Sequence, residues 1–177
     1  MEMLAKILSV LGIVAALSVG AWFVFFNRAM PTETLPPYVL PELTQAYTNE
    51  AYQFSLKLPA DFSVREVPDT GAGGATLVFE NTKNEGIQIL VMPFDEDVTV
   101  LSARRIKEDI PDMKVFDEQP VEIGQEHTGL AFRSDNKEFN GASREVWFVF
   151  EGNLYQISTY ERLDPLLKAV FQTWKFL

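Results

Sequence analysis

His127 is the only histidine of the sequence, and the chain has no cysteine. A triad of nucleophile, histidine and acid would therefore have to use His127. This residue lies in "GQEHTG", a stretch typical of an exposed turn between strands. Ser143 opens a predicted strand and Ser158 alternates within another, so neither lies in an activated-nucleophile motif. A zinc site would need three carboxylates, an uncommon ligand set. We predict no catalytic residue and no enzyme.

The stretch "NKEFNG" places Asn136, Glu138 and Asn140 at alternate positions, with Gly141 following. This spacing is similar to the first ligands of a calcium loop. The last ligand of such a loop should be a bidentate acid, but that position is Trp147, inside a predicted strand. Asn140-Gly141 between strands is itself a strong turn signal. The stretch is predicted to be a hairpin loop without a metal ion.

Two further stretches could bind ions. "GAGG" at 71–74 precedes a strand and not a helix, which argues against a phosphate loop. "DED" at 95–97 could bind a divalent cation weakly. The start of a helix also favours acidic residues through its dipole, and this is the preferred interpretation. The sequence therefore predicts neither a metal site nor a cofactor.

Arg104, Arg105 and Lys107 concentrate positive charge on one predicted helix of a chain whose formal net charge is −10. A solvated helix face is the usual meaning of such a cluster. The alternative is a docking patch for an acidic partner, and these three residues are the candidates for partner docking. The acidic balance of the chain argues against nucleic-acid binding, because phosphate backbones would be repelled.

Residues 7–26, "ILSVLGIVAALSVGAWFVFF", contain no charge and no proline. As a helix they would span about 30 Å, the thickness of the hydrocarbon core of a bilayer. Residues 1–27 are therefore predicted to be a transmembrane anchor that contacts the lipid bilayer through 7–26. The alternative is a cleaved signal peptide with a basic start at Lys6 and a cleavage site near Ala21. The apolar run continues beyond that site, which favours the anchor.

The short tail before the span is expected to stay cytoplasmic, which places the rest of the chain outside the cytoplasmic membrane as a single-pass protein. Residues 28–46 contain Pro31, Pro36, Pro37 and Pro41 and are predicted to be an extended linker. Residues 47–177 form the predicted folded domain.

The stretch "AYQFSLKLPADF" alternates apolar Tyr52, Phe54, Leu56 and Leu58 with polar residues, which predicts a half-buried strand. A helix capped by Asp97 or Thr99 should end before Pro111, and a terminal helix over 165–174 should be capped by Asp164. Further strands are predicted at 62–67, 75–81, 86–94, 119–125, 128–134, 143–151, 153–160 and 175–177, with a hairpin turn at Gly152-Asn153. This order predicts an α+β domain with an antiparallel sheet sandwiched between helices.

"YTNEAYQFSLKLPADF" resembles the opening of PsbP-like domains, and "NLYQISTYE" with "AVFQTWKF" is similar to their closing pattern. The resemblance covers residues 47–177 in element order and implies the same sandwiched sheet. The family includes an extrinsic photosystem subunit and bacterial membrane-anchored or lipid-anchored proteins, and this chain looks like a membrane-anchored bacterial-type member. It lacks the long N-terminal region with which the photosystem subunit docks, so oxygen evolution and manganese or calcium handling are not expected.

The expected function is that of a membrane-tethered, extracytoplasmic, non-catalytic binding or assembly module for a protein partner or small ligand. The alternatives are a tethered hydrolase that uses carboxylates not identifiable in the sequence, and a secreted binding protein released by signal cleavage. A convergent pair of acids with raised pKa values in a deep pocket would favour the hydrolase, whereas a flat surface would favour binding.

Overall fold

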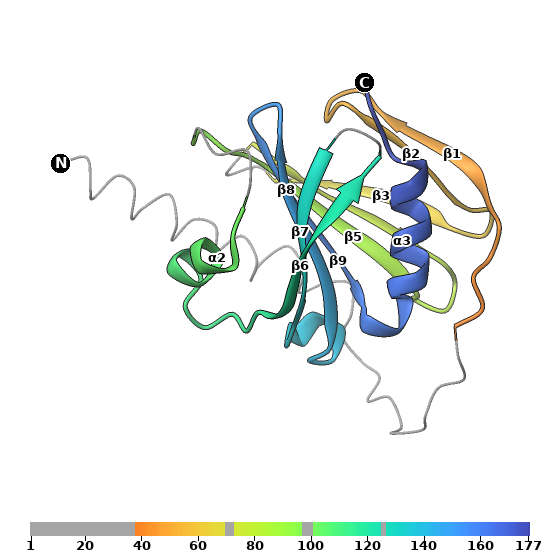
Figure 1. Ribbon diagram of the computed structural model, residues 1–177. Helices are drawn as coiled ribbons and strands as arrows, with labels where there is room; N and C mark the ends of the chain where they lie inside the picture. Colours follow the sequence, from red (N-terminus) through yellow and green to blue (C-terminus); the bar gives the residue numbers. More distant parts are fainter. Residues whose placement is uncertain (1–37, 70–72, 97–100, 125–126) are drawn as a thin grey trace.

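Two antiparallel sheets form the framework of the molecule (Figure 1). The computed structural model describes residues 38–69, 73–96, 101–124 and 127–177. The predicted anchor at 7–26 lies outside these residues, as do Asp97 and Thr99, the predicted caps of the first domain helix. None of the helices in the described ranges has both the length and the hydropathy of a membrane span.

The larger sheet has seven strands, and every neighbouring pair is antiparallel. In spatial order they are β3 (Ser63–Pro68), β4 (Ala75–Glu80), β5 (Gly86–Pro93), β9 (Asn153–Tyr160), β8 (Ser143–Phe150), β7 (His127–Ser134) and β6 (Phe116–Ile123). Most neighbours in the sheet are also neighbours in sequence. The exception is β5 with β9, which joins the two halves of the chain.

The smaller sheet consists of β1 (Leu43–Asn49), β2 (Phe54–Pro59) and β10 (Lys175–Phe176), in the order β1-β2-β10. Strand β1 begins inside the predicted linker of residues 28–46. The predicted burial of Phe54, Leu56 and Leu58 is confirmed, and Tyr52 lies in the preceding turn, partly buried against the same core. These strands were expected to belong to one sheet with the others. They form a separate layer, in which β2 pairs with β1 on one side and with β10 on the other.

Two helices cover opposite faces of the large sheet. Helix α2 (Ala103–Asp109) packs on one face through Ile106, while α3 (Asp164–Thr173) and the small sheet cover the other face. The predicted α+β class with an antiparallel sheet between helices is therefore confirmed. The sheets contribute more of the domain than predicted, because the small sheet shares one face with α3.

Three local details differ from the sequence predictions. Helix α2 is capped by Ser102, whose Oγ accepts a hydrogen bond from the Arg105 backbone N–H (3.2 Å). Asp164 does not cap α3, because its carboxylate pairs with Arg144 and Lys168, and a 3₁₀ turn (Glu161–Leu163) leads into the helix instead. The β8–β9 turn lies at Glu151-Gly152, one residue earlier than predicted, and both residues have positive φ (47° and 69°).

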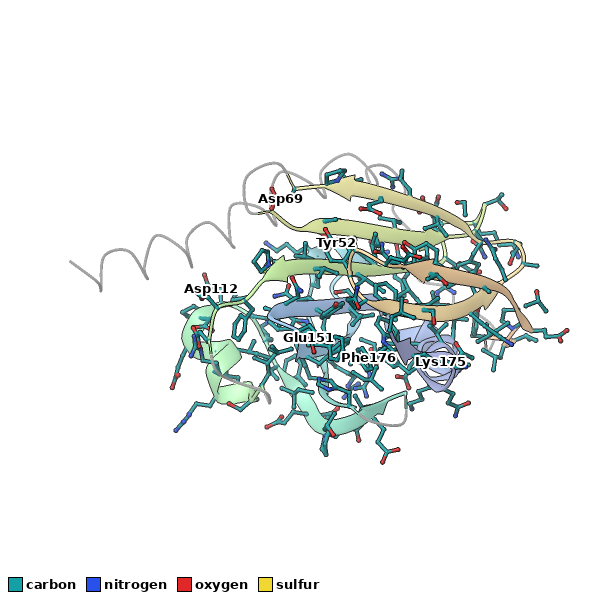
Figure 2. All side chains as sticks on the ribbon, turned by 90° about the horizontal axis from the view of Figure 1, so that it is seen from above. Tyr52, Asp69, Asp112, Glu151, Lys175 and Phe176 are labelled. Carbon is teal, nitrogen blue, oxygen red and sulfur yellow. The ribbon has the colours of Figure 1, made fainter. Side chains whose placement is uncertain are left out.

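The main core lies between the large sheet and the layer formed by α3 and the small sheet, and Figure 2 shows its side chains from above. Trp174, at the C-terminal end of α3, joins these layers. Its ring stacks on Phe54 of β2 (centroids 4.4 Å apart) and meets Phe148 of β8 edge-on (5.8 Å). Trp174, Phe171 and Val170 are all buried.

Replacing Trp174 with alanine should lower the free energy of unfolding by about 3–5 kcal/mol, because a large ring buried between both sheets leaves a cavity. Denaturant unfolding of the full chain measures this loss. The control is Gln172→Ala on the same helix, whose exposed side chain should contribute less than about 0.5 kcal/mol. An unchanged free energy in Trp174→Ala would mean that α3 does not connect the two sheets.

Candidate functional site

A cavity of about 210 Å³ lies on the face of the large sheet that α2 covers. Its floor is formed by the strand residues Gln88, Glu145, Trp147, Gln156 and Ser158. Its rim is formed by half-buried residues of two connections: Ile110 and Met113 after α2, and Asp135, Asn136 and Glu138 between β7 and β8. We call it the Glu145 cavity. Buried polar groups at the bottom of a concavity make it the candidate functional site.

The strand period and the register bring the floor residues together. In β8, Ser143, Glu145 and Trp147 point to the α2 face, because alternate residues of a strand share a face. The register sets Gln88 of β5 opposite Ser158 of β9, and Ser158 opposite Glu145. The next row holds Leu90, Gln156 and Trp147 in the same way. Two adjacent cross-strand rows therefore form the floor.

Glu145 is 1% exposed and makes no ion pair with any residue that the structure describes. Its carboxyl group accepts short hydrogen bonds from the hydroxyls of Ser143 (2.6 Å) and Ser158 (2.5 Å). The Trp147 Nε1 and Asn136 Nδ2 donors are farther away, at 3.4 and 3.5 Å. Burial raises the pKa of Glu145, and these hydrogen bonds offset the effect only in part. The carboxyl group therefore retains its proton to higher pH than an exposed glutamate does.

The rim acids differ in their environment. Desolvation, followed by the charge of Glu145, raises the pKa of Glu138. Asp135 pairs with Lys114 (2.9 Å), and this hydrogen bond lowers the pKa of Asp135. Within the described part of the chain, Glu138 has no cationic partner. Two of the three carboxyl groups that line the cavity are therefore without a compensating charge.

Gln156 is buried, at 5% exposure, and lines the same cavity. No hydrogen bond joins its side-chain amide to another of the described residues. Gln88, which is half-buried and also on the floor, likewise has no side-chain hydrogen bond to another of the described residues. Buried amides are nearly always paired, so these two amides are available to bond with what enters the cavity. The cavity thus exposes polar groups to whatever enters it, whether water or a ligand.

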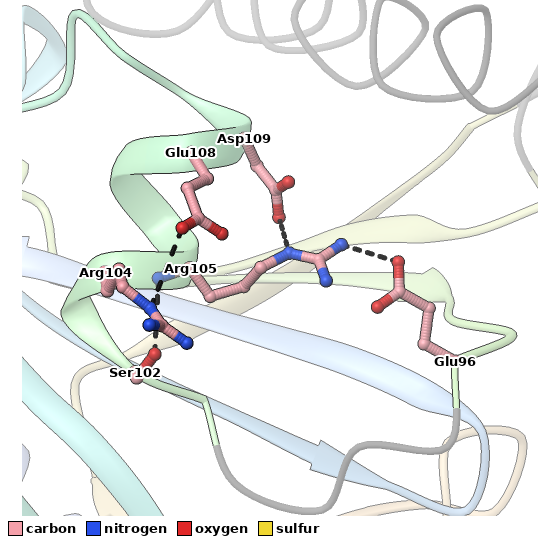
Figure 3. A network of polar contacts seen from close by, with 6 residues as sticks. All are labelled: Glu96, Ser102, Arg104, Arg105, Glu108 and Asp109. Carbon is pink, nitrogen blue, oxygen red and sulfur yellow. Dashed lines mark hydrogen bonds and ion pairs between the residues drawn. The ribbon is translucent and has the colours of Figure 1, made fainter. Parts of the chain in front are cut away.

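The predicted docking residues Arg104, Arg105 and Lys107 lie on α2. Figure 3 shows Arg104 and Arg105 with the acidic residues around them. Arg105 donates hydrogen bonds from Nε to Asp109 (2.7 Å) and from Nη2 to Glu96 (2.6 Å), so neighbouring acids neutralise its charge. Arg104 is exposed and lies 3.7 Å from Glu108. Lys107 is exposed and has no ion-pair partner among the described residues. Partner docking by this cluster stays a prediction.

His127 does not lie in an exposed turn, contrary to the sequence interpretation. It is the first residue of β7 and half-buried, and its Nε2 donates to the carbonyl oxygen of Val149 (2.7 Å). Its ring packs edge-on against Phe148, Phe150 and Phe176. These aromatic residues lie on the α3 side of the large sheet, so His127 is separated from the Glu145 cavity.

The predicted hairpin loop between β7 and β8 is confirmed, since the two strands pair on either side of it. The loop contains a short 3₁₀ turn (Lys137–Phe139), whose start is capped by the Asn136 side chain. Asn140 and Gly141 then both adopt positive φ (56° and 76°). Over the described ranges, no three His, Cys, Asp or Glu side chains are grouped so that they could hold a metal ion.

The sequence interpretation did not identify Glu145 and Gln156 as site residues. The signal was present in β8, where Glu145 alternates with Ser143 and Trp147 on a strand that is apolar from Val146 to Phe150. Ser158 and Gln156 show the same alternation in β9. Polar residues on a strand face that a helix covers are unusual, and this pattern identifies Glu145 and Gln156.

Wild-type stability should fall relative to Glu145→Gln as pH rises. The pKa of Glu145 is raised above its ordinary value of 4.5 in the folded state. Below about pH 4.5 both states are protonated. Above it the unfolded state releases the proton first, so the folded state loses stability until its own pKa is passed, by at most about 1.4 kcal/mol per pH unit.

Denaturant unfolding of both proteins between about pH 4 and pH 8 measures this difference. The matched control is Glu118→Gln, at an exposed position of β6. Its difference from wild type should be flat with pH. A Glu145→Gln difference that is equally flat would show that the buried carboxyl group has an ordinary pKa.

No family model matches this sequence, and no curated protein matches it. The structure is similar to the solution structure of cyanobacterial PsbP (CyanoP) from Synechocystis sp. PCC 6803, with 12% sequence identity and a TM-score of 0.50. That match covers 84% of this chain and 100% of the other. A crystal structure from Bacteroides thetaiotaomicron is less similar, with 10% identity, a TM-score of 0.44, and coverage of 77% of this chain and 49% of the other. The first of these similarities confirms the resemblance at the level of the fold: the described domain is PsbP-like.

Proposed function

We propose that the protein is a non-catalytic binding module whose ligand occupies the Glu145 cavity. One observation carries this proposal: the buried carboxyl group of Glu145 and the unpartnered amide of buried Gln156 face the same cavity. Burial of the Glu145 carboxyl group disfavours its ionised form, and the Gln156 amide is available to bond to what enters the cavity, so a ligand that bonds to both would stabilise the domain. Both also lie on paired strands, which hold a binding site more rigidly than loops do.

The size of the cavity limits what it can hold. An apolar cavity of about 150 Å³ accommodates benzene. The Glu145 cavity, at about 210 Å³, is somewhat larger. A small molecule, or the end of one side chain from a larger partner, would fill it. The half-buried rim leaves an entry between the segment after α2 and the β7–β8 connection.

A hydrolase is the second candidate, because Glu138 and Glu145 share the cavity and both have raised pKa values. A pair of acids with raised pKa values in a cavity is a pattern found at catalytic sites. General acid–base catalysis in this cavity would have no imidazole available, because the single histidine of the chain lies on the other side of the sheet. For this reason we prefer binding to catalysis.

We also propose that residues 7–26 hold the protein in the cytoplasmic membrane. The proline-containing stretch before β1 would then space the domain from the bilayer on the extracytoplasmic side. The support is the uncharged apolar run of bilayer length and the density of prolines that follows it.

Ligand binding can be tested by thermal unfolding of the full chain with four kinds of small probe: n-butylammonium, n-butanol, butyrate and butyramide. At least one should raise the Tm of the wild type. A probe at ten times its Kd stabilises by about 1.4 kcal/mol. The response should be absent in Gln156→Leu, because a leucine between Leu90 and Trp147 would fill the floor with an apolar side chain.

Gln172→Leu, an exposed substitution on α3, is the control and should retain the response. Gln156→Leu itself should unfold at the same temperature as the wild type or higher, since the unpaired amide is removed. If none of the probes stabilises the wild type, or if Gln156→Leu responds equally, the cavity is not a binding site.

Tethering can be tested by fractionation of cells that express the full chain. The protein should remain in the membrane pellet through high-salt and carbonate washes, because an apolar helix of bilayer length is not released by ionic competition. Recovery of a shortened protein that begins near Ala21 or Trp22, outside the pellet, would support signal cleavage and contradict the anchor.

A further inference from the structure

The structure assigns the Glu145 cavity to a cationic nitrogen group, an ammonium or a guanidinium, and this inference rests on the proposed binding function. The residues that line the cavity include three carboxyl groups, of Asp135, Glu138 and Glu145, and neither lysine nor arginine. Anions would be repelled from such a site. A cation would be attracted, and more strongly than at the surface, because the floor is shielded from water.

The charges are not balanced by neighbouring groups. Only Asp135 has a cationic partner, Lys114, and both side chains are partly exposed at the rim. No lysine, arginine or histidine of the described ranges forms an ion pair with Glu138 or Glu145. An ionised carboxylate without a counter-ion is among the most unfavourable arrangements in a protein interior, so burial favours the protonated form of Glu145 in the free domain. A bound cation would supply the counter-charge that allows Glu145 to ionise.

The hydrogen-bonding groups of the floor favour a cation that carries N–H donors. Gln88 and Gln156 each offer an unused amide oxygen. Around Glu145, the contacts with Trp147 and Asn136, at 3.4 and 3.5 Å, lie at the outer limit for hydrogen bonds, so an incoming N–H can displace them. Ammonium and guanidinium groups have three and five donors, respectively. The indole ring of Trp147 lines the same cavity, and aromatic rings attract such cations.

Binding of a cation should be linked to release of a proton. The groups that titrate near Glu145 are Glu138 and Asp135 across the cavity, with Lys114 on Asp135. Burial raises the pKa of Glu145, whereas a cation beside it favours the ionised form. Affinity for an amine should therefore rise with pH up to the pKa of free Glu145, by at most tenfold per unit, while the amine itself stays charged.

The test is a titration of the full chain, with the indole N–H signals followed by NMR. The chain has three tryptophans, and Trp147 donates its N–H to Glu145. n-Butylammonium should shift the Trp147 signal in a saturable manner. The Trp174 signal, from the other side of the sheet, serves as the internal control and should not move. n-Butanol and butyrate should bind at least tenfold more weakly than butylammonium.

Matched variants distinguish the effect of the Glu145 charge on binding from the effect of the shape of the cavity. Glu145→Gln should weaken butylammonium binding at least tenfold and leave n-butanol unchanged, and Glu118→Gln should bind like the wild type. Calorimetry in buffers of different ionisation enthalpy should detect a proton released by the wild type. Glu145→Gln should release less. Equal amine affinity in Glu145→Gln and the wild type would overturn the assignment, because the buried charge would then contribute nothing.

Other outcomes are distinguishable. One outcome is that n-butanol or butyrate binds as tightly as butylammonium and that Gln156→Leu abolishes the binding of that probe. The cationic assignment then fails, but the binding function stands. If none of the probes binds, both fail. A stronger response to millimolar calcium or zinc than to the amine would assign the cavity to a metal ion and overturn the inference.

The same titration identifies the source of the cation. Blocked tripeptides with a central lysine or arginine present the group as a partner protein would, and butylammonium and methylguanidinium present it as small molecules. At least tenfold tighter binding of a peptide than of its free counterpart would support the inference with a protein side chain as the ligand. Equal or weaker peptide binding would support it with a small amine.

Discussion

Burial of the large sheet on both faces is the constraint on which the rest of the structure depends. Strands β8 and β9 lie near its centre, and nearly all their side chains are buried. The α3 face is filled by aromatic and aliphatic residues of both sheets. A polar side chain on either face must therefore find a partner inside the protein, since water does not reach it freely. Arg144 finds Asp164, whereas Glu145 and Gln156 face a cavity.

The two faces are covered unequally, and this difference creates the site. On one side, α3 and the small sheet form a continuous layer in which Trp174 contacts both sheets. On the other side, α2 spans only Ala103–Asp109 and covers part of the sheet. The polar rows that contain Glu145 and Gln156 lie where this cover ends, bordered by connecting segments. If the proposed ligand binds there, it would meet polar groups that the paired strands already hold in place.

Electrostatics separates this cavity from the surface around it. The basic residues of α2 are largely compensated by their own neighbours, with Arg105 bound to both Glu96 and Asp109. The cavity, by contrast, retains uncompensated acidic groups in a chain with a formal net charge of −10. Long-range attraction would bring cations towards the acidic domain, and the buried groups would then provide selectivity. The basic cluster that stands out in the sequence is thus a less distinctive feature of the structure than one buried glutamate.

Local sequence patterns predicted most of the elements and the fold class, although not strand β1, which begins inside the predicted linker. The alternation of Phe54, Leu56 and Leu58, the Asn140-Gly141 turn and the terminal helix are local patterns. Each was located correctly because it depends on residues a few positions apart. Only the tertiary structure shows that β2 lies outside the main sheet and pairs with β10, which follows it by more than a hundred residues. It alone set Gln88, Ser158 and Glu145 in one row. Strand register is a long-range property: a shift of one residue would turn Glu145 to the opposite face, and no local pattern fixes which strands become neighbours.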